Sequence, residues 1–301
     1  MAHEHRHEHS AEIASLNTAF IIGIVLNAGF VIIEFIAGFW YDSLGLISDA
    51  GHNLGDVASL VLAMLAFRLS KIHSNTRYTY GYKKSTVLVS LLNAVILLIA
   101  VGFILTESIE KLFHPRPVDG DAVAWVAGAG VIVNAVTAWL FMRDKEKDLN
   151  VKGAYLHMAA DALVSIGVVI SGILIQHTGW YIIDPLIGIV IVIIIVYSTW
   201  GLLRGSLRLS LDGVPIGTDY EHIGQTIVSV PGVKSIHHMH IWALSTTETA
   251  LTVHIVVESM QQMDPLKCKI KSVLRKEGIA HATLEFETIA GHCSEEECDA
   301  V

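Results

Sequence analysis

Charged residues are scarce in this sequence. Asp, Glu, Lys and Arg make up 16% of the 301 residues, whereas hydrophobic residues make up 52%. Soluble domains usually contain about 25% charged residues. This shortage excludes an ordinary soluble protein, and the mean hydropathy of +0.55 indicates an integral membrane protein with a soluble part.

Cysteine is scarce too, because the sequence contains only Cys268, Cys293 and Cys298, which are too few for a disulfide framework. The first residues, MAHEHRHEHSAE, contain no apolar segment, so we expect no cleavable signal peptide. The sequence also lacks the G-x-S-x-G motif of hydrolases and a glycine-rich phosphate loop. The absence of these two motifs argues against an enzyme.

Positive charge is in short supply as well. The net charge is −9, and residues 209–301 hold 13 acidic side chains against 6 Lys and Arg. Proteins that bind nucleic acid need a basic face for the phosphates. The charge therefore excludes a nucleic-acid partner and is compatible with cations as ligands.

Six apolar segments are long enough to cross a membrane as helices, which need about 20 residues. They cover residues 17–40, 46–67, 85–106, 122–142, 153–176 and 181–203. We therefore predict an α-helical membrane protein with six transmembrane helices, followed by a soluble α+β domain. The predicted divisions are a histidine-rich tail at 1–16, a transmembrane domain at 17–208, a soluble domain at 209–290, and a tail at 291–301.

The Lys and Arg residues of short loops decide how a membrane protein is oriented. The loop after the third segment has only Lys111 and Arg116, and the loops after the first and fifth have none. The regions after the second, fourth and sixth segments hold Arg68, Lys71, Arg77, Lys83 and Lys84; Arg143, Lys145, Lys147 and Lys152; and Arg204 and Arg208. We therefore predict that both termini are cytoplasmic.

Two of the apolar segments contain the same polar pattern, H-x-x-x-D. His52 and Asp56 form it in the second segment, and His157 and Asp161 form it in the fifth. Residues four apart lie on one face of a helix, so each helix offers one imidazole and one carboxylate. Ionisable residues inside a membrane are costly and mark an ion pathway by default.

Four nitrogen and oxygen ligands suit a tetrahedral Zn²⁺ ion. The alternative is that each pair makes a polar contact between packed helices. Asp49 lies three residues before His52 and is either a rival ligand or a carboxylate favoured by the helix dipole at the start of its helix. Imidazole must be neutral to bind metal, so zinc and protons compete for such a site.

The chain resembles the cation diffusion facilitator family. The similarity rests on SLGLISDAGHNLGDVASL, RYTYGYKK, LNVKGAYLHMAADALVSIGVVI, VPGVKSIHHMHIWAL and LTVHIVVE. Within the family, the chain is most similar to the bacterial zinc/cadmium/cobalt-resistance branch. The resemblance implies a homodimeric exporter of divalent metal in the lipid bilayer, with Zn²⁺ as its usual cargo and Cd²⁺ or Co²⁺ as further cargo, driven by inward proton exchange. It also implies that His52, Asp56, His157 and Asp161 form the transport site. Short termini and loops favour a bacterial inner membrane.

The sequence pattern of the soluble region predicts helix 218–229, strands 233–243 and 249–258, helix 264–277 and strand 281–288. This order is typical of a small sheet with helices on one face. Because side chains alternate along a strand, we expect His238 and His240 on one face and His237 on the other.

The family resemblance implies that this domain is ferredoxin-like, or metallochaperone-like, and that it binds metal and mediates dimerisation. It places His237, His254, Glu285 and Glu287 near a cytoplasmic zinc site at the dimer interface. Relatives often have His and Asp where this chain has the two glutamates.

Further residues are weaker candidates for metal or proton binding, among them His238 and His240 in the soluble domain. The tract at His3, His5, His7 and His9 either captures zinc or is a solubilising tail. Cys293 and Cys298 either bind metal beside the soluble domain or belong to an acidic tail. Glu34 is a candidate proton step and His73 a candidate loop ligand. A metal sensor without transport and a membrane metalloenzyme are the alternative functions.

Overall fold

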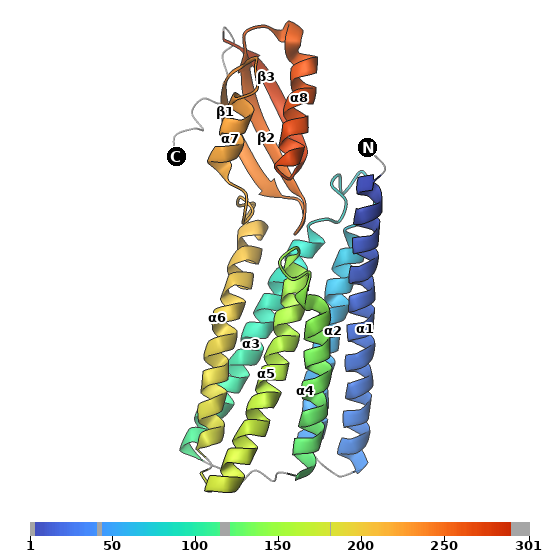
Figure 1. Cartoon of the computed structure of the whole chain (residues 1–301), viewed down its shortest axis with the longest axis vertical. Helices are drawn as coiled ribbons and strands as arrows, with labels where there is room; N and C mark the ends of the chain where they lie inside the picture. Colours follow the sequence, from blue (N-terminus) through green and yellow to red (C-terminus); the bar gives the residue numbers. More distant parts are fainter. Residues whose placement is uncertain (1–3, 41–43, 115–120, 181, 290–301) are drawn as a thin grey trace.

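The computed structural model describes residues 4–40, 44–114, 121–180 and 182–289, and some side chains within these ranges lie outside the description. In this part of the chain, six long helices form a bundle and a small α+β domain sits at one end of it (Figure 1). The bundle helices are α1 (Glu4–Trp40), α2 (Leu44–Leu69), α3 (Ser85–Phe113), α4 (Asp121–Met142), α5 (Leu149–Thr178) and α6 (Ile183–Ser210). The soluble domain contains α7 (Tyr220–Val228), β1 (Val233–Ala243), β2 (Thr249–Val257), the 3-10 helix η1 (Met260–Gln262), α8 (Met263–Lys276) and β3 (Ile279–Thr288).

Three segments among the described residues are long and apolar enough to cross a membrane, namely Thr18–Ala37 in α1, Ser85–Phe113 in α3 and Pro185–Ser210 in α6. Large apolar side chains such as Phe39, Phe103 and Ile193 are exposed on these helices, as expected where a helix faces lipid. The chain is therefore an integral membrane protein. Membrane crossing by α2, α4 and α5 stays a prediction.

Helix α5 lies at the centre of the bundle because it packs on both sides. One buried cluster joins α5, through residues such as Met158, to Phe20, Leu60 and Phe141 of α1, α2 and α4. A second cluster joins Ala160 of α5 to apolar residues of α3 and α6. Polar groups on α5 are thus held in the interior by apolar contacts on either side.

The soluble domain is a three-stranded mixed sheet with two helices on one face. Strand β2 is central, antiparallel to β1 and parallel to β3. Alternate residues of β2, such as Leu251 and Ile255, bury against Ile227 of α7 and Ile270 of α8. The predicted order of helix, strand, strand, helix, strand is confirmed, whereas a ferredoxin-like fold stays a prediction.

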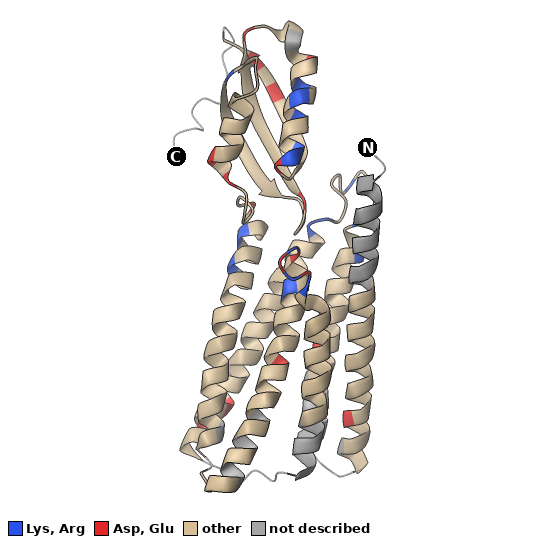
Figure 2. Cartoon of the chain, viewed as in Figure 1, with Lys and Arg blue, Asp and Glu red and all other residues tan. Residues whose placement is uncertain are grey.

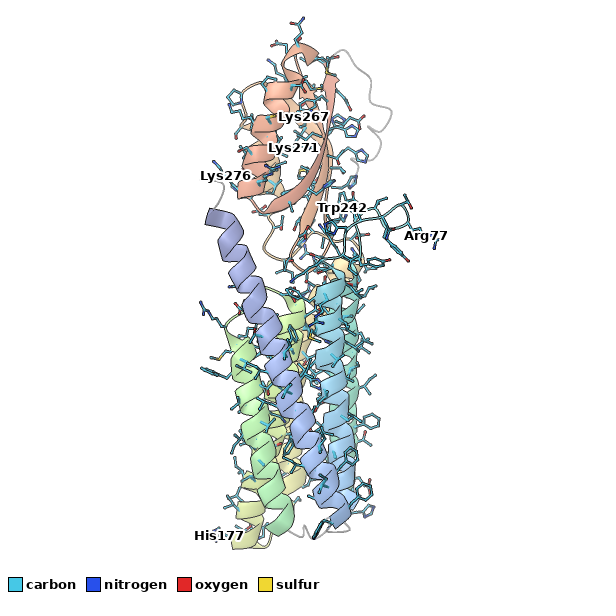
Figure 3. The ribbon with its side chains drawn as sticks, turned by 90° about the vertical axis from the view of Figure 1, so that its right-hand side faces the viewer. Arg77, His177, Trp242, Lys267, Lys271 and Lys276 are labelled. Atoms are coloured by element: carbon cyan, nitrogen blue, oxygen red, sulfur yellow. The ribbon has the colours of Figure 1, made fainter. Side chains whose placement is uncertain are left out.

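Lys and Arg gather at the end of the bundle next to the soluble domain (Figure 2). Figure 3 shows Arg77 and Trp242 at the level of this junction and His177 at the far end of the bundle. Two ion pairs cross or flank the junction: Lys83 contacts Glu248 at 2.5 Å, and Lys84 contacts Asp212 at 2.5 Å. The basic loops and the soluble domain therefore lie at the same end of the helix bundle. The cytoplasmic location of this end stays a prediction.

A hydrogen-bonded joint ties the turn between β1 and β2 to α5. Asp148 caps α5, since its Oδ1 accepts from the backbone N–H groups of Asn150 and Val151 at 2.7 and 3.2 Å. The other oxygen of Asp148 accepts from the hydroxyl of Thr246 at 2.5 Å. The backbone N–H of Thr246 donates to Thr86 Oγ1 of α3 at 3.1 Å. One turn of the soluble domain thus contacts the starts of two bundle helices.

Replacing Thr246 with valine should loosen this joint. The change keeps the shape of the side chain and removes a hydrogen bond to a carboxylate, which contributes about 1.5–3 kcal/mol. We expect amide hydrogen exchange at Asn150 and Val151 to become about tenfold faster. Thr247→Val is the matched control, because the Thr247 hydroxyl contacts Ser245 within the turn; equal effects of both changes would contradict a specific joint.

Candidate metal centre

Helices α2 and α5 bring three of the predicted membrane ligands together. Asp56, His157 and Asp161 each offer a ligand atom, and these atoms all lie within 4.8 Å of one another. His157 Nε2 lies 2.5 Å from Asp56 Oδ1 and 3.9 Å from Asp161 Oδ2. An imidazole between two carboxylates has the donor set of a zinc site.

The protein interior shields this membrane cluster. Asp56 is 2% exposed and His157 is 7% exposed, while Asp161 is half-buried. Asp56 Oδ2 is buried without a hydrogen-bond partner among the described groups. Buried carboxylates need a cation, a proton or a hydrogen bond. The cluster therefore has the capacity to accept a cation.

The fourth predicted ligand, His52, lies in α2 four residues before Asp56. Its side chain lies outside the description, and so does that of Asp49. One helical turn separates His52 from Asp56 on a shared face. Its place in the site, and the choice between His52 and Asp49, stay predictions.

Glu34 of α1 is fully buried, at 0% exposed. Asn53 of α2, the neighbour of His52 in sequence, donates a hydrogen bond from Nδ2 to Glu34 Oε2 at 2.7 Å. The carboxylate thus joins α1 to the polar stretch of α2. Sequence reasoning missed the part of Asn53 in this contact, although a buried acid and a nearby amide are a recognisable pair in membrane helices.

A second cluster lies on the face of the sheet opposite the helices. His254 Nδ1 lies 2.6 Å from Glu287 Oε1, and His237 Nε2 lies 3.6 Å from Glu287 Oε2. The ligand atoms of these three side chains lie within 4.8 Å of one another. Glu285 lies beside them, with Oε2 3.4 Å from His254 Nε2. Two imidazoles and a carboxylate match zinc's preferred donors.

The prediction that His237 and His238 lie on opposite faces of the strand is wrong. The rings of both contact His254, with centroids 5.1 and 5.0 Å away, and the His238 ring lies 4.5 Å from that of His240. The register of β1 against β2 shifts between His237 and His240, and His238 has a positive φ of 50°. This β-bulge adds one residue and turns both side chains to the same face.

The remaining candidates fall outside these clusters or outside the described side chains. His73 lies exposed in the loop between α2 and α3. His3, Cys293 and Cys298 lie outside the described residues, and the side chains of His5, His7 and His9 of α1 are not described.

Family comparisons agree with this architecture. The cation efflux transmembrane domain matches residues 20–209, and the cytoplasmic domain of cation efflux proteins matches residues 215–288. The chain belongs to the cation efflux family, also called the cation diffusion facilitators. Its members are transporters, which fits the absence of hydrolase motifs in the sequence.

Three bacterial relatives of this cation efflux protein align over nearly its whole length. The "Zinc transporter ZitB" of Pectobacterium atrosepticum is 35% identical over 301 residues, covering 99% of this chain and 92% of the relative. The "Cadmium, cobalt and zinc/H(+)-K(+) antiporter" of Bacillus subtilis is 34% identical over 291 residues, covering 95% and 92%. The "Metal cation efflux system protein CzcD" of Cupriavidus metallidurans is 34% identical over 285 residues, covering 94% and 89%.

Proposed function

We propose that this cation efflux protein exports Zn²⁺ from the cytoplasm in exchange for protons, with Cd²⁺ and Co²⁺ as further cargo. The observation that carries the proposal is the buried group of Asp56, His157 and Asp161 on two bundle helices. Relatives named as zinc transporters and as a cadmium, cobalt and zinc antiporter support the choice of cargo. We place the protein in a bacterial inner membrane with both termini cytoplasmic.

Proton exchange follows from the kinds of side chain in the site. A metal ion binds neutral imidazole and ionised carboxylate, so it competes with protons for the same atoms. His157 lies between two carboxylates, so metal and protons compete for three neighbouring groups. The site thus alternates between a metal-bound form and a protonated form, and a proton gradient strips metal on the acidic side.

The soluble domain supplies dimerisation and a second metal site in this proposal. His237, His254 and Glu287 hold metal on the open face of the sheet, where a second copy of the domain packs. The joint between Thr246 and Asp148 gives this domain a direct contact with α5, the helix that carries His157 and Asp161. Metal binding on the sheet would then bias the position of α5.

Reconstitution of the full chain in liposomes that contain a zinc dye and a pH dye tests the proposal. We expect zinc uptake with proton release from the same vesicles, in the presence and absence of a potassium gradient. Zinc flux without proton movement would contradict proton exchange and leave transport standing. Zinc binding without any flux would favour the alternative, a membrane metal sensor.

A further inference from the structure

A small cavity lies next to His157, on the side of the transport site that faces the soluble domain. We propose that Asn93 and Ser59 form a waiting position there, in which an incoming divalent cation exchanges part of its water shell for neutral oxygens before it reaches the charged ligands. This inference rests on the proposed transport function and assigns it two further residues.

The cavity is built from three helices. It has a volume of about 10 Å³ and is lined by Ser59 and Leu60 of α2, Asn93 of α3, and Gly153, Ala154 and His157 of α5. This is close to the smallest volume that holds one water molecule. Three of the lining residues offer polar groups, and a buried water needs at least two polar partners.

The position of the cavity along the helices follows from their direction. Helix α2 ends, and α3 and α5 begin, next to the soluble domain (Figure 1). Ser59 follows Asp56 by three residues along α2, and Gly153 precedes His157 by four residues along α5. Both residues therefore lie one turn nearer to the soluble domain than the ligand on the same helix. Asn93 packs against Gly153, so a cation that comes from that side meets Asn93 and Ser59 before Asp56 and Asp161.

Among the described residues, Asn93 has an unpaired amide oxygen that suits this role. The side chain is 7% exposed, and its Oδ1 is buried without a hydrogen-bond partner in the described part of the chain. An unpaired carbonyl oxygen inside a helix bundle is unfavourable unless water or a cation satisfies it. Neutral oxygens replace water around a cation yet hold it weakly enough to let it pass on. Zinc is then retained by imidazole and carboxylate at the next step.

A matched comparison exists elsewhere in the bundle. Asn134 of α4 is also buried, and its Oδ1 also lacks a hydrogen-bond partner among the residues that the structure describes. Asn134 does not line the cavity beside His157. An effect that depends on the cavity should follow substitution of Asn93, whereas an effect of losing any buried amide should follow substitution of either residue.

The test uses the full chain with Asn93→Leu, Asn134→Leu and the oxygen-retaining Asn93→Thr. Leucine has nearly the shape of asparagine and is apolar, so the bundle should fold. We expect Asn93→Leu to lower kcat/KM for zinc transport in liposomes about tenfold, while the equilibrium zinc affinity of the membrane site changes less than about twofold. Asn134→Leu should transport at the wild-type rate, and Asn93→Thr should recover at least half of the loss.

The outcomes separate this inference from the proposed function. Wild-type transport with an unaffected Asn93→Leu variant would overturn the waiting position and leave the transporter intact. Equal losses in Asn93→Leu and Asn134→Leu, or a parallel loss of zinc affinity in Asn93→Leu, would assign Asn93 a structural role and would also overturn it. Absence of flux in the wild type would instead overturn the proposed function itself.

Discussion

Replacing Asp161 with asparagine should reduce zinc flux through liposomes carrying this protein by at least about 100-fold. Loss of a group that only orients a metal ligand typically costs 10–100-fold, and loss of a charged ligand should cost more. The substitution keeps the volume of the side chain and removes the negative charge that lies 3.9 Å from His157 Nε2 in the wild type. Zinc and pH dyes inside the vesicles measure both fluxes, and both should fall together.

Asp144→Asn is the matched control for this experiment. Asp144 lies between α4 and α5 and pairs with Lys147 at 3.0 Å, away from the membrane cluster. An ion pair at the protein surface contributes about 0–1 kcal/mol to stability. The control should therefore transport normally. Persistent flux in Asp161→Asn, or an equal loss in the control, would show that the transport site has been misplaced.

The second large effect concerns the soluble domain. His254→Ala should weaken zinc binding to this domain by at least about 100-fold, because it removes one of three clustered ligands and leaves Glu287 without its 2.6 Å partner. Calorimetric titration of the full chain in the Asp161→Asn background measures this binding without a contribution from the intact membrane site. One class of zinc site should disappear from the titration.

His222→Ala provides the control in the same domain. His222 is exposed, 3.5 Å from Glu277, and belongs to neither ligand cluster. Its substitution should leave the zinc titration unchanged. If His254→Ala kept wild-type affinity, the cluster on the sheet would be a set of polar contacts, and metal control of the transporter through this domain would lose its basis.

Much of this architecture could be predicted from the sequence. The apolar stretches predicted six long helices because a helix of about 20 residues matches the bilayer. The spacing of His157 and Asp161 predicted a shared helix face, and Asp56 of α2 indeed lies beside them. These predictions rest on local periodicity and on the repeat of one H-x-x-x-D motif in two segments, both of which a single sequence records directly.

Contacts between distant segments that no repeated motif marks could not be predicted. The bulge at His238 was missed because nothing in a run of histidines and apolar residues records an extra residue in the register. The joint between Thr246 and Asp148 brings together groups 98 residues apart. The sequence does indicate the local part of this joint, the capping of α5, because an Asp before an apolar helix is a capping signal.

Asn93 shows the same limit in the membrane. An asparagine in an apolar helix usually makes a hydrogen bond to a neighbouring helix, and such a bond forms between Asn27 Nδ2 and Thr137 Oγ1 at 3.0 Å. Asn27, Asn93 and Asn134 all occur in apolar surroundings, so the sequence cannot rank them. Asn27 differs from Asn93 by its hydrogen bond to Thr137, and the position of Asn93 beside His157 separates it from Asn134.

The most direct test of the central claim is to locate zinc in crystals of the full-length protein by anomalous diffraction at the zinc edge. We predict a peak between Asp56, His157 and Asp161, with ligand distances of about 2.0–2.2 Å, and a second peak at His237, His254 and Glu287. A map with zinc on the soluble domain and none between α2 and α5, from protein that transports zinc, would contradict the assignment of the transport site.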